Sequence, residues 1–161
     1  MCAGDPKEGT EPPRWFSNAP FVSNVRARGA ALGVEFTLGC ERMPNTLLAH
    51  ALLELAGEVS ASKQNEVAEI LFRQYHTDGL YPDEENVVSA AIEAGLGEQQ
   101  AREAITSKYR LEAVNQECKK TVSWGMPLGF GGGVPYFLID GKRGGLSGAQ
   151  EPAALLKAFE R

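Results

Sequence analysis

The chain has 161 residues, of which 43% are hydrophobic, and a formal net charge of −5 at pH 7. This length and composition are typical of one globular domain with an ordinary core. The acidic balance argues against the clustered lysines and arginines that bind nucleic acid or anionic membranes, so we expect neither partner.

The cysteines Cys2, Cys40 and Cys118 lie far apart in the sequence and form no Cys-x-x-Cys pair. Their odd number and wide spacing favour reduced thiols over a disulfide framework. No window of 18 apolar residues predicts a membrane span, and residues 1–14 lack the apolar segment of a secretory signal. We therefore expect a cytoplasmic protein.

The N-terminal segment, residues 1–20, contains four prolines among charged residues and glycines. This pattern excludes a regular helix and predicts a disordered leader. A first helix is then predicted from Phe21, with Val25 and Leu32 on one apolar stripe and Gly33 at its end. A second helix follows Asn45 and Thr46, either of which can cap it.

Four more helices are predicted before residue 124. One begins near Ser62 and stops at 77–79, the next follows Pro82 with acidic residues at its positive dipole end, and another covers about 98–107. The last should bury one apolar face, made of Leu111, Val114, Cys118 and Val122.

A β-hairpin is predicted after a glycine-rich connector at 125–133. The apolar run 136–139 reads as a buried strand, and residues 142–146 as the return strand. Between them, Asp140-Gly141 is typical of a two-residue type I′ turn.

A final helix opens at Glu151-Pro152 and should turn Leu155, Leu156 and Phe159 inward. The hairpin is unusual in having no third strand. Because two strands alone are marginal in water, either its open edge pairs with something else or part of the fold is absent.

Four motifs occur along the chain in a fixed order. They are PNTLLAH at 44–50, LFRQYHTDG at 71–79, AGL at 94–96, and GVPYFLIDG at 133–141 followed by LSGAQ at 146–150. Together they resemble the DsbA-like thioredoxin-fold family, and within it the FrnE-type oxidoreductases and the 2-hydroxychromene-2-carboxylate isomerases.

The resemblance implies the α/β class, as an incomplete thioredoxin-like fold. A domain at 21–161 would hold a large helical insertion, at about 21–123, followed by the hairpin and C-terminal helix, at about 134–161. The family opens with a strand–helix–strand unit that carries Cys-x-x-Cys, or a serine in the isomerases. Such a unit needs roughly 30 residues or more. Since about 20 polar residues precede the first matching helix, we expect this unit to be missing and predict no catalytic residue.

The resemblance also implies a cis peptide bond before Pro135. In the family, the backbone at this position faces an extended peptide or glutathione, so we predict Val134 and Pro135 as substrate-binding residues. The alternative is a trans proline that opens a strand.

The remaining reactive side chains read as structural. Cys118 should be a buried thiol that packs like a small hydrophobe, and Cys40 an incidental loop thiol. His50 is expected to pack or cap its helix, and neither His50 nor His76 has a partner at metal-ligand spacing, so no metal is predicted. No cofactor is predicted either, although the resemblance admits glutathione.

Three interpretations of the chain remain open on this basis. The resemblance implies a thiol–disulfide oxidoreductase, or an isomerase relative, that is inactive as this chain alone and whose family acts on a peptide or protein thiol. The alternative is a non-catalytic module that binds a peptide or partner chain along the hairpin edge, including a second copy as a homodimer. The third is an unstable fragment whose apolar faces lack cover.

Overall fold

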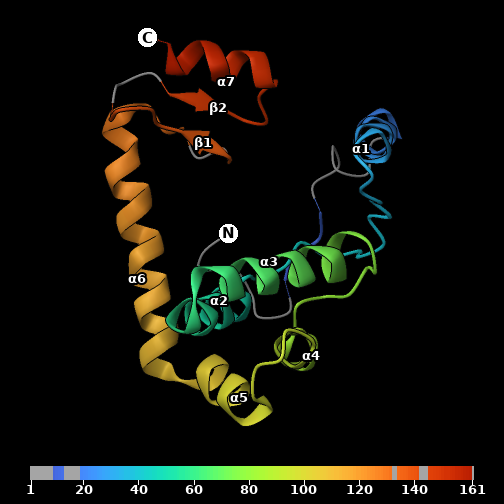
Figure 1. The fold of residues 1–161 in the computed structure, drawn as a ribbon, viewed down its shortest axis with the longest axis vertical. Coiled ribbons are helices and arrows are strands. Elements are labelled where there is room, and N and C mark those ends of the chain that lie inside the picture. The colour runs from blue at the N-terminus through green and yellow to red at the C-terminus, as the bar shows by residue number, and fades with distance from the viewer. Residues whose placement is uncertain (1–8, 13–18, 132–133, 142–144, 161) are drawn as a thin grey trace. The chain divides into compact units, whose positions relative to one another are not determined.

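The computed structural model describes residues 9–12, 19–131, 134–141 and 145–160. Its elements, in chain order (Figure 1), are α1 (Ala19–Ala31), α2 (Leu47–Val59), α3 (Ala61–His76), α4 (Glu84–Glu93), α5 (Glu98–Thr106), α6 (Lys108–Gly125), the 3-10 helix η1 (Met126–Leu128), β1 (Tyr136–Phe137), β2 (Leu146–Ser147) and α7 (Pro152–Phe159). The chain divides into two compact units, residues 1–115 and 116–161. This mostly helical architecture with a small two-stranded antiparallel hairpin agrees with the predicted α/β class.

The core of the first unit lies between α2, α3, α4 and α5, where α2 packs against each of the other three. Its largest fully buried side chains are Leu52, Ile105, Val67, Val87 and Val88. Much of the remaining core is alanine, which lets neighbouring helix backbones approach closely. The apolar periodicity correctly marked Leu52, Val67 and Val87 as inward positions of α2, α3 and α4, whereas Ile92, which was also expected to be buried in α4, is 51% exposed.

The starts of these helices are fixed by short polar side chains. Asn45 Oδ1 accepts from the Leu47 N–H at 3.0 Å, whereas Thr46 makes no side-chain cap, so the first of the two predicted candidates is used. Ser60 caps α3 through Lys63 N–H, and Asp83 caps α4 through Asn86 N–H. Each bond satisfies a backbone donor that has no partner inside the helix.

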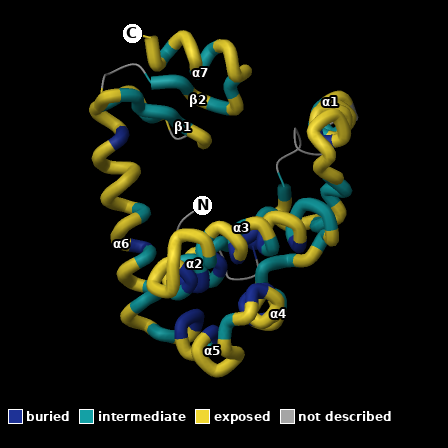
Figure 2. The backbone as a smooth tube through the Cα atoms, in the orientation of Figure 1, coloured by how far each residue is buried: buried dark blue, intermediate teal, exposed yellow. Residues whose placement is uncertain are grey.

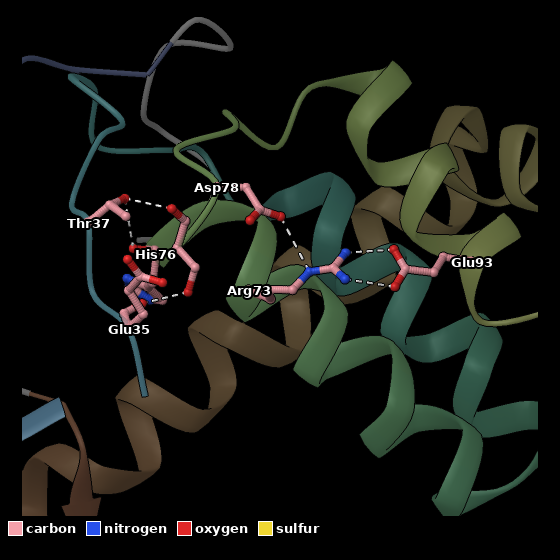
Figure 3. A network of polar contacts seen from close by, with 7 residues as sticks. Glu35, Thr37, Arg73, His76, Asp78 and Glu93 are labelled. Atoms are coloured by element: carbon pink, nitrogen blue, oxygen red, sulfur yellow. Dashed lines mark hydrogen bonds and ion pairs between the residues drawn. The ribbon is translucent and has the colours of Figure 1, made fainter. Parts of the chain in front are cut away.

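The C-terminal end of α3 is closed by a strap formed by residues 35–38. The His76 carbonyl accepts from the N–H groups of Thr37 and Leu38 at 3.0 and 3.3 Å. The Thr37 hydroxyl donates to Thr77 O, and the Thr77 hydroxyl donates to Glu35 O, each at 2.6 Å. Figure 3 shows this end of the helix, whose last carbonyls would otherwise have no intrahelical partner.

The same figure shows an ion-pair group on the neighbouring face of the first unit. Arg73 donates to both carboxylate oxygens of Glu93, at 2.9 and 2.6 Å, and its Nε lies 3.3 Å from Asp78 (Figure 3). These bonds join α3 to α4, and because the Glu93 carboxylate accepts from the Arg73 guanidinium, the pKa of Arg73 is raised.

The first helix does not bury the stripe that its sequence suggested. In α1, Phe21 and Val25 are half-buried, while Leu32 is 81% exposed just beyond the helix end. Gly33 adopts a positive φ of 74°, as predicted for a helix terminator. The periodicity marked the helix, but within the described residues no other element packs on α1 to cover the stripe.

Part of the expected leader is ordered. Thr10 forms an isolated antiparallel bridge with Met43, in which each N–H donates to the other residue's carbonyl at 3.0 and 2.8 Å. Gly9 is buried beside Tyr81. The rest of the expected leader, apart from Glu11, Pro12, Ala19 and Pro20, lies outside the described residues.

The second unit contains the hairpin. The strands are shorter than predicted: β1 and β2 pair Tyr136 with Ser147 and Phe137 with Leu146. Asp140 and Gly141 both have positive φ, of 53° and 65°, as a type I′ turn requires. The loop between the paired residues Phe137 and Leu146 is nevertheless longer than a two-residue turn at 140–141 would give. The start of the expected return strand, residues 142–144, lies outside the described residues.

The apolar faces of this second unit are not enclosed. No residue of α7 is buried, and Leu156 and Phe159 are 63% and 69% exposed, so the prediction that they face inward is wrong. The expected apolar face of α6, which crosses from the first unit into the second, is only partly covered, since Leu111, Val114 and Cys118 are half-buried and Val122 is exposed. In Figure 2, burial is concentrated in α2 to α5, whereas the hairpin and α7 are intermediate or exposed. Within the described residues, the apolar side chains of α6 and α7 are at most half-buried.

Within the described ranges, no helix combines the length and apolarity needed to cross a bilayer.

Candidate functional site

The candidate site is the segment that enters β1. The Val134–Pro135 peptide bond is cis in the structure. Val134 is 80% exposed, and in the described part of the chain its main chain has no hydrogen bond. Both predicted binding residues therefore lie at the surface, with the N–H and carbonyl of Val134 available to a ligand.

The hairpin fixes the direction of the neighbouring backbone groups. The Pro135 carbonyl accepts from Gly148 N–H at 2.8 Å, and Phe137 pairs with Leu146. In an antiparallel ladder, successive residues direct their main-chain groups to opposite edges. Since Pro135 and Phe137 face β2, the main-chain groups of Tyr136 between them face the other edge. The described residues place no strand there.

Tyr136 holds this segment in position, a role that sequence reasoning missed. Its hydroxyl donates to Leu128 O at 3.0 Å and accepts from Gly145 N–H at 3.1 Å. Its ring meets Phe130 edge-on, with centroids 5.5 Å apart. The tyrosine thus joins η1 and the approach to β2. An aromatic residue directly after the proline was the available signal, because a half-buried tyrosine usually bonds through its hydroxyl.

The cysteines do not assemble a dithiol site among the described residues. Cys40 is a half-buried free thiol, with Sγ 3.5 Å from the Arg42 carbonyl. The same carbonyl accepts from the Tyr75 hydroxyl at 2.9 Å, and burial raises the pKa of Tyr75 to about 12. Cys118 is bonded in a disulfide on half-buried α6, so the expected buried, reduced thiol at this position is wrong.

The two histidines have separate structural surroundings. His50 Nδ1 lies 2.8 Å from the Thr46 carbonyl, one turn earlier at the start of α2. His76 lies among the rings of Phe36, Phe72 and Tyr75, with centroid separations of 5.6, 6.3 and 4.9 Å. Its Nδ1 is buried without a hydrogen-bond partner, and burial lowers its pKa. Where the chain is described, no three His, Cys, Asp or Glu side chains are grouped to hold a metal ion.

Comparisons with known proteins agree on the fold. The sequence model of the DSBA-like thioredoxin domain family matches residues 20–160 of this chain. Among solved structures, a probable DsbA oxidoreductase from Streptomyces coelicolor superposes with a TM-score of 0.77 at 24% identity, over 97% of this chain and 69% of that one. A search of curated proteins found no match.

Proposed function

The chain belongs to the DSBA-like thioredoxin domain family, a thiol–disulfide oxidoreductase-type family, and on this premise we propose that it binds an extended segment of a protein substrate along the main chain at Val134. We further propose that this chain does not itself exchange a Cys-x-x-Cys disulfide, because its sequence contains no such pair. The order of the four sequence motifs supports its assignment to the branch that contains the FrnE-type oxidoreductases and the 2-hydroxychromene-2-carboxylate isomerases.

The observation that carries the proposal is the free backbone of Val134 at an exposed position. Val134 is 80% exposed and, in the described residues, its N–H and carbonyl bond to no other group. An extended peptide can add to such an edge through its own N–H and carbonyl groups, which requires little of the peptide's sequence. Such binding accepts peptides of different sequence, as a family that acts on protein thiols requires.

The binding test uses alkylated insulin B chain carrying a fluorophore, with anisotropy as the readout. Val134→Pro removes one main-chain donor and should weaken binding by about three- to tenfold, which corresponds to one hydrogen bond. Val134→Ala is the matched control, because it keeps the N–H and carbonyl and should bind within about twofold of wild type. Equal weakening by both variants would mean that the side chain is recognised, and would contradict the proposal.

The lack of dithiol chemistry is tested by the rate at which the chain reduces insulin with dithiothreitol as electron donor. Wild type and Cys40→Ser should both reduce insulin no faster than dithiothreitol does alone. The reason is that Cys40 is a single free thiol in the described residues, and dithiol exchange needs a pair. A rate well above that background, lost in Cys40→Ser, would instead identify a cysteine that acts without a sequence neighbour.

A further inference from the structure

The half-buried His76 ring, at the end of α3, is a titratable group that the proposed function does not use. Its Nδ1 is enclosed and, in the described residues, has no hydrogen-bond partner. The rings of Phe36, Phe72 and Tyr75 lie around it, with centroids 4.9 to 6.3 Å from its own. A protonated imidazole carries an N–H at both nitrogens. Protonation would therefore place a charge among these rings and leave the Nδ1–H without an acceptor, which is unfavourable.

Of the three rings that cover His76, that of Phe36 is the one that can withdraw. Phe72 and Tyr75 belong to α3, which is anchored in the core of the first unit by the buried Leu71. Phe36 belongs to the strap at 35–38, in which no residue is buried. A segment with so little buried surface opens at a lower free-energy cost than a core helix.

The strap is attached to the same residue whose ring it covers (Figure 3). The His76 carbonyl accepts from the N–H groups of Thr37 and Leu38, and the Thr37 hydroxyl donates to the Thr77 carbonyl. Leu38 has a φ of 52°, in the left-handed region that leucine rarely adopts, so opening also relieves backbone strain. A change at His76 therefore acts directly on a weakly held segment.

Charged groups around His76 do not compensate for its burial. Those on the surrounding elements, together with the other titratable groups there, are Arg26 of α1, Glu35 of the strap, Arg73 and Tyr75 of α3, and Cys40, Arg42 and Asp78 of the neighbouring loops. The Arg26 guanidinium donates to the carbonyls of Phe36 and Thr37. Burial lowers the pKa of His76, and no charge among the described residues contributes to this shift. The protonated ring thus gains no counter-ion while the strap is closed.

We propose that the gain of a proton by His76 opens the strap and gives the charged ring access to water. The closed strap is favoured while the ring is neutral, above about pH 6.5, and this preference is lost as the pH falls below that value. Opening separates Phe36 from the rings of α3 and so exposes apolar surface. The first unit would then contain an acid-sensitive conformational switch. It goes beyond the proposed function and does not involve Val134, so the two can fail separately.

The experiment is amide hydrogen exchange of the full chain, followed by NMR as a function of pH. Each rate is divided by the rate of an unstructured peptide at the same pH, which gives a protection factor. Between about pH 7.5 and about pH 5.5, protection of Thr37 and Leu38 should fall several-fold, with about tenfold as the ceiling for one proton. The Leu96 amide, which donates to the Ala91 carbonyl at the end of α4, should keep its protection.

Three variants separate His76 from other acid-sensitive groups. His76→Phe keeps a ring in the cluster but cannot take up a proton, and its strap protection should not depend on pH. His50→Gln removes the other histidine of the chain, and Glu35→Gln removes the carboxylate of the strap. Both of these variants should show the pH dependence of the wild type.

Protection of Thr37 that is independent of pH in the wild type would overturn the proposal, and so would a dependence that persists in His76→Phe or disappears in Glu35→Gln. An equal loss of protection at Leu96 would overturn it too, because the whole unit would then unfold. If His76→Phe does not fold, the ring of His76 is titrated by NMR in the wild type. A ring that gains its proton while Thr37 stays protected would also refute the switch.

Discussion

Replacing Thr37 by valine tests whether the strap at 35–38 closes the end of α3. The Thr37 hydroxyl donates to the Thr77 carbonyl at 2.6 Å and accepts from Gly39 N–H at 3.2 Å. Valine keeps the β-branched shape but makes neither bond. At about 0.5–1.5 kcal/mol for each bond, the sum is about 1–3 kcal/mol. Because the site is half-buried and water can replace part of this, we expect a loss of about 1–2 kcal/mol.

Urea unfolding followed by far-ultraviolet circular dichroism measures this loss. With a slope of about 2 kcal/mol per molar urea, the midpoint should fall by about 0.5–1 M with the slope unchanged. Thr106→Val is the matched control: that hydroxyl bonds to the Arg102 carbonyl of its own helix, and its removal should change stability by less than about 0.5 kcal/mol. A Thr37→Val variant as stable as wild type, or a control that loses as much, would refute this account of the strap.

Three further predictions concern the core, the buried histidine and the hairpin. Leu52→Ala empties a fully buried site and should cost about 2–5 kcal/mol in the same assay, whereas a loss below about 1 kcal/mol would place Leu52 outside the core. Burial lowers the pKa of His76, so below about pH 6.5 the unfolded chain binds a proton at this residue more readily than the folded chain does. The free energy of unfolding should therefore be highest above about pH 6.5 and fall below it, and His76→Phe should flatten this pH dependence. An unchanged slope in His76→Phe would assign the acid sensitivity to another group. Gly145→Ala puts a Cβ against the Phe137 carbonyl and should open the hairpin, seen as faster amide exchange at Gly148, while Gly131→Ala, where the added Cβ meets no atom within 4 Å, should not.

The amino-acid sequence was sufficient for the position and capping of most helices. Leu52, Val67 and Val87 are buried as the 3.6-residue periodicity of α2, α3 and α4 indicates, and Asn45 and Asp83 begin helices because a short polar side chain satisfies a free N–H group. The glycine at 33 and the pair Asp140–Gly141 have the positive φ values expected of them. These features depend on residues close together in the chain.

The candidate site was predicted from motif resemblance, and local pattern alone would not have found it. Nothing in the residues next to Val134 marks it as a binding residue, and its exposure depends on what packs around the hairpin. The hydroxyl of Tyr136, which joins Leu128 and Gly145, was not predicted because both partners are backbone groups brought near it by the fold.

What the sequence determined was where the helices lie and which side of each is apolar. What only the tertiary structure decided was whether a partner covers that side. Leu156 and Phe159 carry the same amphipathic signal as Leu52 and Val67, yet the first pair is exposed and the second buried. The physical reason is that periodicity reports the preference of one face for an apolar environment, whereas burial requires a second element that the same sequence pattern does not specify.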